Sequence, residues 1–549
     1  MKRNKSMKLS LPILISTMAI TTPTTLTSCS SSGVVLANFE SYMSSDLMTQ
    51  LHSEYPIKFV NYSTNEDILA KFANSYDIAV PSTYAVLELI KQGLCGQLDW
   101  EYLGQEFQLT ADPERLEGTS LTLQSITNAK PVSVDYKPLD PTNGDTANAQ
   151  WLFSDTIDDV INSVDEYAHE NNYYPLDQSI LQYALPYFLQ DWMFAYHGDY
   201  MDSLPSSNMQ VSDDNQWYSA YEDGRPVTWN DVTNTIASNN PNLDDRFKPG
   251  KTSRNLTMVD DSRTIYDMSH LIYDAQQPGY DPYANDNINP NSEQTTEDAM
   301  KEIYGSLTDK FNPNTFNLNT DSQQVLYSFA KPKGNPDDAE FGMSNGIIAY
   351  NGDILYAAMG SGIDEWEDTW YCDPDGSDEY PLKDGNFHIV KMKNTPIALD
   401  MMVINKKVNN SSKKHEVYSL IDKIVLEGSN LPAATEEGSE EPWIGETNKD
   451  DEFVYGPTLN FDFVSYTPTL WNLSKFVSRD MEDPDEYNSY FDMIYPNPDP
   501  SKPNNKAELL AEINSVNFAK GDGGLLELPL SDLTKSRMSK VYLQYREKI

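Results

Sequence analysis

Cysteine, histidine and positive charge are all scarce in this chain. Only 3 Cys and 6 His occur among 549 residues, and 39 Lys and Arg stand against 84 Asp and Glu, for a formal charge of -45. So few Cys exclude a disulfide scaffold, and the scattered His residues show no spacing typical of a zinc site. The acidic excess disfavours nucleic acid and anionic membrane surfaces as partners, because both would be repelled. It is compatible with a cationic ligand, although net charge mainly reports solubility.

Long apolar runs are also rare, and the one near the N-terminus has the features of an export signal. A basic segment, 1–8, precedes an apolar stretch, 9–20, and a Thr-rich segment then leads to Leu-Thr-Ser and Cys29. A basic head, a short apolar body and small residues before a cleavage point are typical of a secretory signal. Cys29 at that point indicates a lipoprotein: residues 1–28 would be removed, and Cys29 would carry acyl chains such as palmitate. We therefore expect a protein anchored to the cell membrane on its extracytoplasmic face.

Behind a lipid-anchored spacer, 29–33, short apolar strands alternate with helical segments. Strands are predicted at 34–39, 57–60 and 77–80, and helices at 46–52, 65–73 and 84–92. Later strands are predicted at 255–260, 346–350 and 397–404, and later helices at 415–426 and 535–548. Such alternation implies crossover units and a mostly parallel sheet. In sheets of this kind, ligands bind beyond the carboxyl ends of the strands.

Four segments rich in Asp, Asn, Pro, Ser and Gly interrupt this pattern. We interpret them as long surface insertions, partly disordered; they span 204–226, 275–335, 360–385 and 428–456. Besides Cys29 the chain contains Cys95 and Cys372. Either one disulfide or two buried thiols would fit their number.

Two short patterns imitate chemical motifs. Residues 342–346 match the G-x-S-x-G of serine hydrolases, but a strand-like run follows the Ser where a helix is needed, so we attribute the match to chance. Residues 373–379 cluster oxygen ligands around a Gly but lack the terminal bidentate Glu of a calcium loop. A solvated acidic loop is the preferred interpretation there, with a weak Ca²⁺ site as the alternative. We expect no enzyme activity and no cofactor.

Several segments, in the same order along the chain, resemble those of bacterial spermidine/putrescine-binding proteins, the extracytoplasmic receptors of polyamine ABC importers. Residues 75–86, S-Y-D-I-A-V-P-S-T-Y-A-V, are similar to the family's Y-D-[LV]-V-V-P-S-T-Y-x-V. Residues 37–42, A-N-F-E-S-Y, resemble its opening N-W-[ST]-[ED]-Y. Further similarities lie at 185–187 (L-P-Y), 227–232 (V-T-W-N-D-V), 260–263 (D-D-S-R) and 466–468 (Y-T-P).

The resemblance implies an α/β fold, a two-lobed periplasmic-binding-protein-like (type II) clamp with long surface insertions. Lobe 1 would comprise 34–190 plus 399–480, and lobe 2 would comprise 191–398 plus 481–549. The implied function is to bind a polyamine, spermidine or putrescine, in the cleft between the lobes and to deliver it to the permease subunits of an ABC transporter. The alternative is a surface lipoprotein with a degenerate binding-protein fold that acts in adhesion or assembly.

The resemblance also implies a set of ligand-binding residues, in which carboxylates supply charge and aromatic faces pack against methylenes and attract ammonium groups. They are Phe39, Glu40, Tyr42, Ser82, Tyr84, Asp261, Tyr350, Asp400 and Tyr466. Three positions depart from the family pattern. Glu40 comes one place early, Thr264 replaces a Glu for which Asp267 would substitute, and Ala398 replaces a Trp. These changes leave open which amine is bound.

Overall fold

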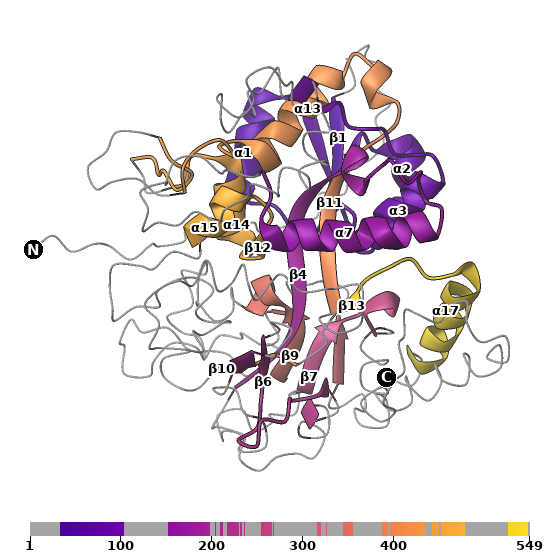
Figure 1. Ribbon diagram of the computed structural model, residues 1–549, viewed down its shortest axis with the longest axis vertical. Helices are drawn as coiled ribbons and strands as arrows, with labels where there is room; N and C mark the ends of the chain where they lie inside the picture. The colour runs from indigo at the N-terminus through magenta and orange to yellow at the C-terminus, as the bar shows by residue number, and fades with distance from the viewer. Residues whose placement is uncertain are drawn as a thin grey trace, which may run out of the picture.

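The protein is described here by a computed structural model (Figure 1). It describes residues 33–100, 102–103, 152–197, 204, 209–211, 217–229, 231–232, 235, 254–265, 267, 316–319, 325–326, 344–354, 387–392, 396–433, 442–449, 452–477 and 525–546. Within these ranges, no helix is both long enough and apolar enough to cross a membrane. The predicted signal, Cys29, Cys372, the acidic loop at 373–379 and the insertion at 360–385 lie outside the described residues.

The elements predicted from the sequence are confirmed wherever the structure describes them. The strands are β1 (Val34–Phe39), β2 (Ile57–Tyr62), β3 (Ile78–Ala79), β4 (Ala184–His197), β5 (Met209–Val211), β6 (Trp217–Ser219), β7 (Arg254–Val259), β8 (Phe316–Asn319), β9 (Ser344–Tyr350), β10 (Phe387–Val390), β11 (Pro396–Ile404), β12 (Thr467–Pro468) and β13 (Leu525–Leu526). The helices are α1 (Ser45–Glu54), α2 (Asn65–Ser75), α3 (Thr83–Lys91), α7 (Asp155–Glu170), α13 (Lys414–Ile421), α14 (Gly456–Val464), α15 (Trp471–Val477) and α17 (Asp532–Arg546). Short 3-10 turns lie at Ile180–Gln182 and Val408–Asn410, and a π-helical turn, Asp422–Leu426, extends α13.

Eleven of the described strands form one sheet. Eight of them follow the order β2-β1-β3-β11-β4-β9-β7-β8, and the other three, β10, β12 and β13, pair with β4 or β11 beside this path. The pairings β1 with β2 and β3 are parallel, as are those of β7 with β8 and β9. Between these two groups, β4 and β11 run antiparallel to each other and extend from the upper to the lower half of the molecule (Figure 1). The strand order and the parallel pairing on each side match the predicted α/β clamp, in which crossing strands join two lobes. The sheet as a whole is mixed, not mostly parallel as predicted, because the crossing strands pair antiparallel with β3, with β9 and with each other.

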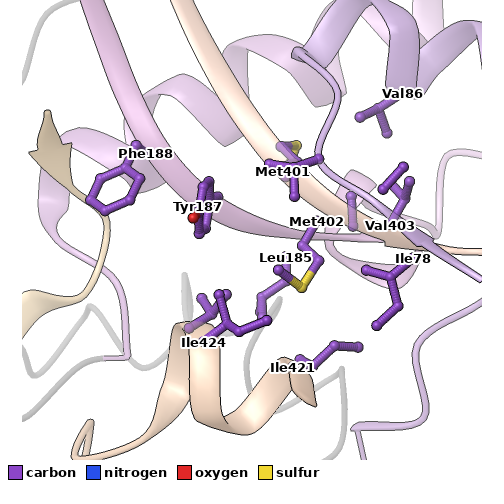
Figure 2. Packing of buried hydrophobic residues seen from close by; sticks show 14 of the residues in the cluster. Ile78, Val86, Leu185, Tyr187, Phe188, Met401, Met402, Val403, Ile421 and Ile424 are labelled. Atoms are coloured by element: carbon purple, nitrogen blue, oxygen red, sulfur yellow. The ribbon is translucent and has the colours of Figure 1, made fainter. Parts of the chain in front are cut away.

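Two separate hydrophobic cores define the two lobes. The lobe 1 core packs around β1–β3 and the first half of β4, and Figure 2 shows Leu185 and Met402 of the crossing strands beside Ile421 and Ile424. The lobe 2 core surrounds the second half of β4, with β7, β9, β10 and α17. Tyr350 packs against both cores. The residue boundaries between the lobes stay predictions.

Helix α2 is held against the returning strand by one buried side chain, Asn405. Its Nδ2 donates to the carbonyls of Phe72 (2.9 Å) and Tyr76 (3.2 Å), at the C-terminal end of α2, where carbonyls lack helical partners. Its Oδ1 accepts from the amide of Lys407 (3.2 Å). Asn405 therefore satisfies backbone groups on both sides of the contact.

Replacing Asn405 with Ala is expected to lower the free energy of unfolding by about 1–3 kcal/mol, because buried carbonyls lose their donor. Urea denaturation measures the change. The matched control is Lys71→Ala, which removes an exposed ion pair to Asp67 (3.1 Å) and should shift stability by less than about 0.5 kcal/mol. Equal effects of the two substitutions would contradict this role of Asn405.

Three of the predicted insertions contain ordered structure that the composition obscured. In 428–456, Ile444 and Phe453 belong to the lobe 1 core, so the prediction of a surface insertion is wrong for that part. Strand β8 lies within 275–335, and β5 and β6 lie within 204–226. In these segments, short apolar stretches pair or pack: β8 pairs with β7, β5 and β6 pair with each other, and Ile444 and Phe453 pack in the core.

Cys95 is a buried free thiol, so the alternative of a disulfide at this residue is excluded. Burial raises the pKa of the thiol well above its ordinary value. A thiol of this kind is unreactive and acts as a small apolar side chain.

Candidate ligand-binding site

The crossing strands carry a buried carboxylate, Asp400, at an irregular point of the sheet. Asp400 pairs with Phe188, whereas Met401 pairs with Pro186, so the register shifts between Asp400 and Met401. Such a bulge redirects side chains relative to the regular alternation. Asp400 is 1% exposed and lies in the middle of the strand that joins the two lobes.

Neutral donors surround the Asp400 carboxylate. Ser82 Oγ donates to its Oδ1 (2.6 Å), and Gln190 Nε2 donates to its Oδ2 (2.6 Å) and to Tyr42 Oη (2.7 Å). Ser82 is the N-cap residue of α3, whose positive end favours a negative charge at this point. Asn65 fixes Ser82 by donating to its Oγ (3.1 Å) and accepting from its amide (3.0 Å).

Burial raises the pKa of Asp400 to about 7, although hydrogen bonds from Ser82, Tyr42 and Gln190 oppose the shift. The donors satisfy the oxygens, but they bring no positive charge to compensate for desolvation. A cation beside Asp400 would favour its ionised form. The site is therefore electrostatically suited to an ammonium group.

Aromatic rings from lobe 1 and its crossing segments form a wall around this carboxylate. The Tyr42 ring lies 6.0 Å from that of Phe39, 5.3 Å from that of Tyr187 and 5.2 Å from that of Tyr466, with edge-to-face angles of 75°, 86° and 73°. Tyr187 Oη donates to the Tyr42 carbonyl (3.0 Å), which holds the turn after β1 in place. Phe39 remains partly exposed, so this wall is accessible to solvent at one edge.

A second group of charged side chains gathers around Tyr84. The Arg263 guanidinium lies over the Tyr84 ring (4.9 Å to its centre), and Tyr84 Oη donates to Glu66 Oε1 (3.3 Å). Burial raises the pKa of Tyr84, and the charges of Glu66 and Asp261 add to the effect. Burial also raises the pKa of Asp261. Glu66 is exposed, yet partial loss of hydration next to the protein raises its pKa, and the negative charge of Asp261 adds to this effect.

Tyr350 connects the two groups electrostatically. Burial is the largest cause of its raised pKa, and the negative charges of Glu527, Asp400 and Asp261 raise the pKa further. The Tyr350 ring packs on Trp192 of β4, with ring centres 4.5 Å apart. It is partly exposed at the end of β9, between the cores of the two lobes.

The structure brings together most of the residues that the sequence indicated. Tyr42, Ser82 and Tyr466 lie around Asp400. The second group contains Tyr84 and Asp261, and the Asp261 and Asp400 charges both act on Tyr350. Glu40 is exposed in the turn after β1, where Ser41 adopts a positive φ of 58°. The binding role of Glu40, which comes one place early in the sequence, stays a prediction.

Four residues of the site were missed. They are Gln190, Asn65, Glu66 and Glu527. For Glu527 a signal was present, because it lies inside the apolar run L-L-E-L-P-L and a charge at such a place needs an explanation. Gln190 follows the predicted crossing segment by only three residues, but no pattern in the sequence marks it.

A family model described as "Hypothetical lipoprotein (MG045 family)" matches residues 7–492. The chain belongs to this lipoprotein family. The match includes the segment around Cys29, the crossing strands and Asp400. No curated protein is significantly similar in sequence.

The solved structures similar to this chain include ABC transporter binding proteins and a eukaryotic thiaminase-I. A protein described as a spermidine/putrescine ABC transporter from Listeria monocytogenes is 14% identical, with a TM-score of 0.45 over 93% of this chain and 98% of that chain. The TpPotD lipoprotein of Treponema pallidum is 11% identical, with a TM-score of 0.44 and coverage of 93% and 98%. A Listeria monocytogenes ABC substrate-binding protein in complex with cycloalternan is 10% identical, with a TM-score of 0.41 and 94% coverage of both chains. At these values, none of their ligands can be assigned to this lipoprotein.

Proposed function

We propose that this lipoprotein binds a polyamine between its two lobes and delivers it to an ABC permease. The observation that carries the proposal is the gathering of Asp400, Asp261 and Glu527 with Tyr42, Tyr84 and Tyr350 at the junction of the lobes. Carboxylates with raised pKa values gain most from a cation, and aromatic faces accommodate the methylenes between amines. A neutral sugar would leave these carboxylates uncompensated.

The proposed mechanism is a shift between open and closed arrangements of the lobes, without any chemical step. A ligand that contacts Asp400 on the crossing strand and Asp261 in lobe 2 stabilises the arrangement in which the two approach. The closed form would then be recognised by the permease. Anchoring through Cys29 would keep the receptor close to that permease on the extracytoplasmic face, at a high local concentration.

A thermal-shift screen tests this function. Spermidine and putrescine at about a hundred times their dissociation constants should stabilise the folded chain by about 2.7 kcal/mol, whereas maltose at the same concentration should have no effect. Stabilisation by the sugar alone, or no stabilisation by any amine at millimolar concentration, would contradict the proposal. The second outcome would favour the role in adhesion or assembly.

Polyamine affinity is expected to rise with pH between 6 and 8. Asp400 has a pKa of about 7, raised from 3.8, so below 7 the ligand must displace a proton from it. The affinity should rise by about tenfold across this interval, because one ionisation favours the complex. The unliganded chain should show the opposite trend: protonated Asp400 stabilises the fold fully below about pH 4, and this contribution is lost as the pH rises through 7. Calorimetry at pH 6, 7 and 8 checks the first trend, and a flat affinity profile would contradict it.

A further inference from the structure

Glu527 is a buried carboxylate at a third crossing between the lobes. It is 4% exposed, and its amide donates to the Ile397 carbonyl of β11 (3.0 Å). On one side of it, Leu526 packs in the lobe 1 core, and on the other Leu530 packs in the lobe 2 core. A carboxylate at this depth loses most of its hydration, so its charged form is costly unless a cation lies beside it.

The charges around Glu527 are mainly negative. Burial raises its pKa well above the ordinary value, and Asp267, Asp261 and Asp400 add to the shift, while Arg263 opposes it. Arg263 is already engaged, because its Nε donates to Asp267 (2.8 Å) and its Nη2 to the Leu528 carbonyl (2.9 Å). Both members of this ion pair are 3% exposed, which fixes the guanidinium in place. Arg263 is thus already paired with Asp267, while the charges of Asp261 and Asp400 add to that of Glu527.

A route for a ligand to this point is indicated by the exposure of its neighbours. Asp261 and Tyr350 are partly exposed, and Glu66 is exposed at the start of α2. The charges of Glu527 and Asp400 both raise the pKa of Tyr350, so Tyr350 is within electrostatic range of both carboxylates. A flexible chain lying along this ring would carry positive charge toward both carboxylates.

We propose that Glu527, with Asp261 and Glu66, forms a second anionic pole that receives a further ammonium group of the ligand held at Asp400. This inference rests on the proposed function and narrows its ligand to a linear polyamine with three positive charges. A dication that reaches Asp400 leaves part of this second pole uncompensated. A trication compensates both ends, and its longer chain has more methylenes to pack on Tyr350.

The test is calorimetry with spermidine and putrescine on the purified full chain and its Glu527→Gln variant. The wild type should bind spermidine at least about tenfold more tightly than putrescine, and Glu527→Gln should reduce spermidine affinity by about tenfold or more but putrescine affinity by less than about threefold. Glu88→Gln is the matched control. Glu88 also lies between the lobes, but Lys535 already pairs with it (2.7 Å), so both affinities should stay within about threefold.

The outcomes separate this inference from the proposed function. If the wild type binds both amines and Glu527→Gln leaves their affinity ratio unchanged, the second pole is wrong and the polyamine receptor stands. If the wild type binds neither amine, both fall. Glu66→Gln guards against misfolding of the buried variant, because Glu66 is exposed. It should cause a smaller loss, about threefold, that is again confined to spermidine, and an equal loss for both amines would contradict the inference.

Discussion

Replacing Asp400 with Asn is expected to reduce polyamine affinity by about a hundredfold or more, because removing a buried partner of an ion pair costs about 2–5 kcal/mol. The substitution preserves the shape of the side chain, and Ser82 and Gln190 still have an oxygen to which one of them can donate. The loss would therefore report the missing charge. Without ligand, the variant should be at least as stable as the wild type near pH 8, because an uncompensated buried carboxylate has been removed.

The control for Asp400→Asn is Asp422→Asn. Burial and the Glu427 charge raise the pKa of Asp422 to about 7 as well, but it lies in the π-helical turn after α13 in lobe 1. Its replacement should leave polyamine affinity unchanged. Titration calorimetry of both variants gives the comparison, and a similar loss of affinity in the two would remove Asp400 from the site.

Trp192→Ala is expected to cause the largest loss of stability, about 3–5 kcal/mol, because a large buried ring leaves a cavity. Trp192 is 1% exposed in the lobe 2 core and pairs with Tyr350 across β4 and β9. The Tyr350 ring would lose the surface on which it packs, so polyamine affinity should fall as well, by about threefold to tenfold. Urea denaturation followed by fluorescence measures the first effect, and calorimetry measures the second.

Trp192→Phe separates packing from the presence of an indole. A Phe ring keeps most of the contact with Tyr350, and it removes a buried indole Nε1 that has no hydrogen-bond partner among the described residues. This variant should lose no more than about 1.5 kcal/mol. If Trp192→Ala lowered the free energy of unfolding as little as Trp192→Phe, the Trp192 ring would not be an important packing element of the lobe 2 core.

Local pattern was sufficient to predict the first half of lobe 1. The strands β1, β2 and β3 are short apolar segments next to helices with clear caps, such as Ser44 before α1 and Thr64 before α2. In such segments the sequence signal and the final packing agree. The return of Asp400 to this sheet came from the resemblance to polyamine-binding proteins, since nothing in the local sequence places residue 400 beside residue 82.

The parts that could not be predicted depend on long-range contacts. Gln190 and Ser82 meet at Asp400 only because β4 and β11 cross between the lobes. Ile444 joins the lobe 1 core from a segment whose Glu, Pro and Ser content resembles that of a surface loop. The turn that exposes Glu40 has a positive φ at Ser41, which neither composition nor periodicity reveals. In each case tertiary packing decided what local propensity left open.

Titration of the wild-type chain with spermidine at pH 8 tests most directly whether the junction of the lobes is a polyamine site. We expect one ligand per chain, with an affinity that falls by about tenfold when the titration is repeated at pH 6. Binding that persists unchanged in Asp400→Asn, or the absence of any heat with millimolar spermidine at pH 8, would contradict the central claim.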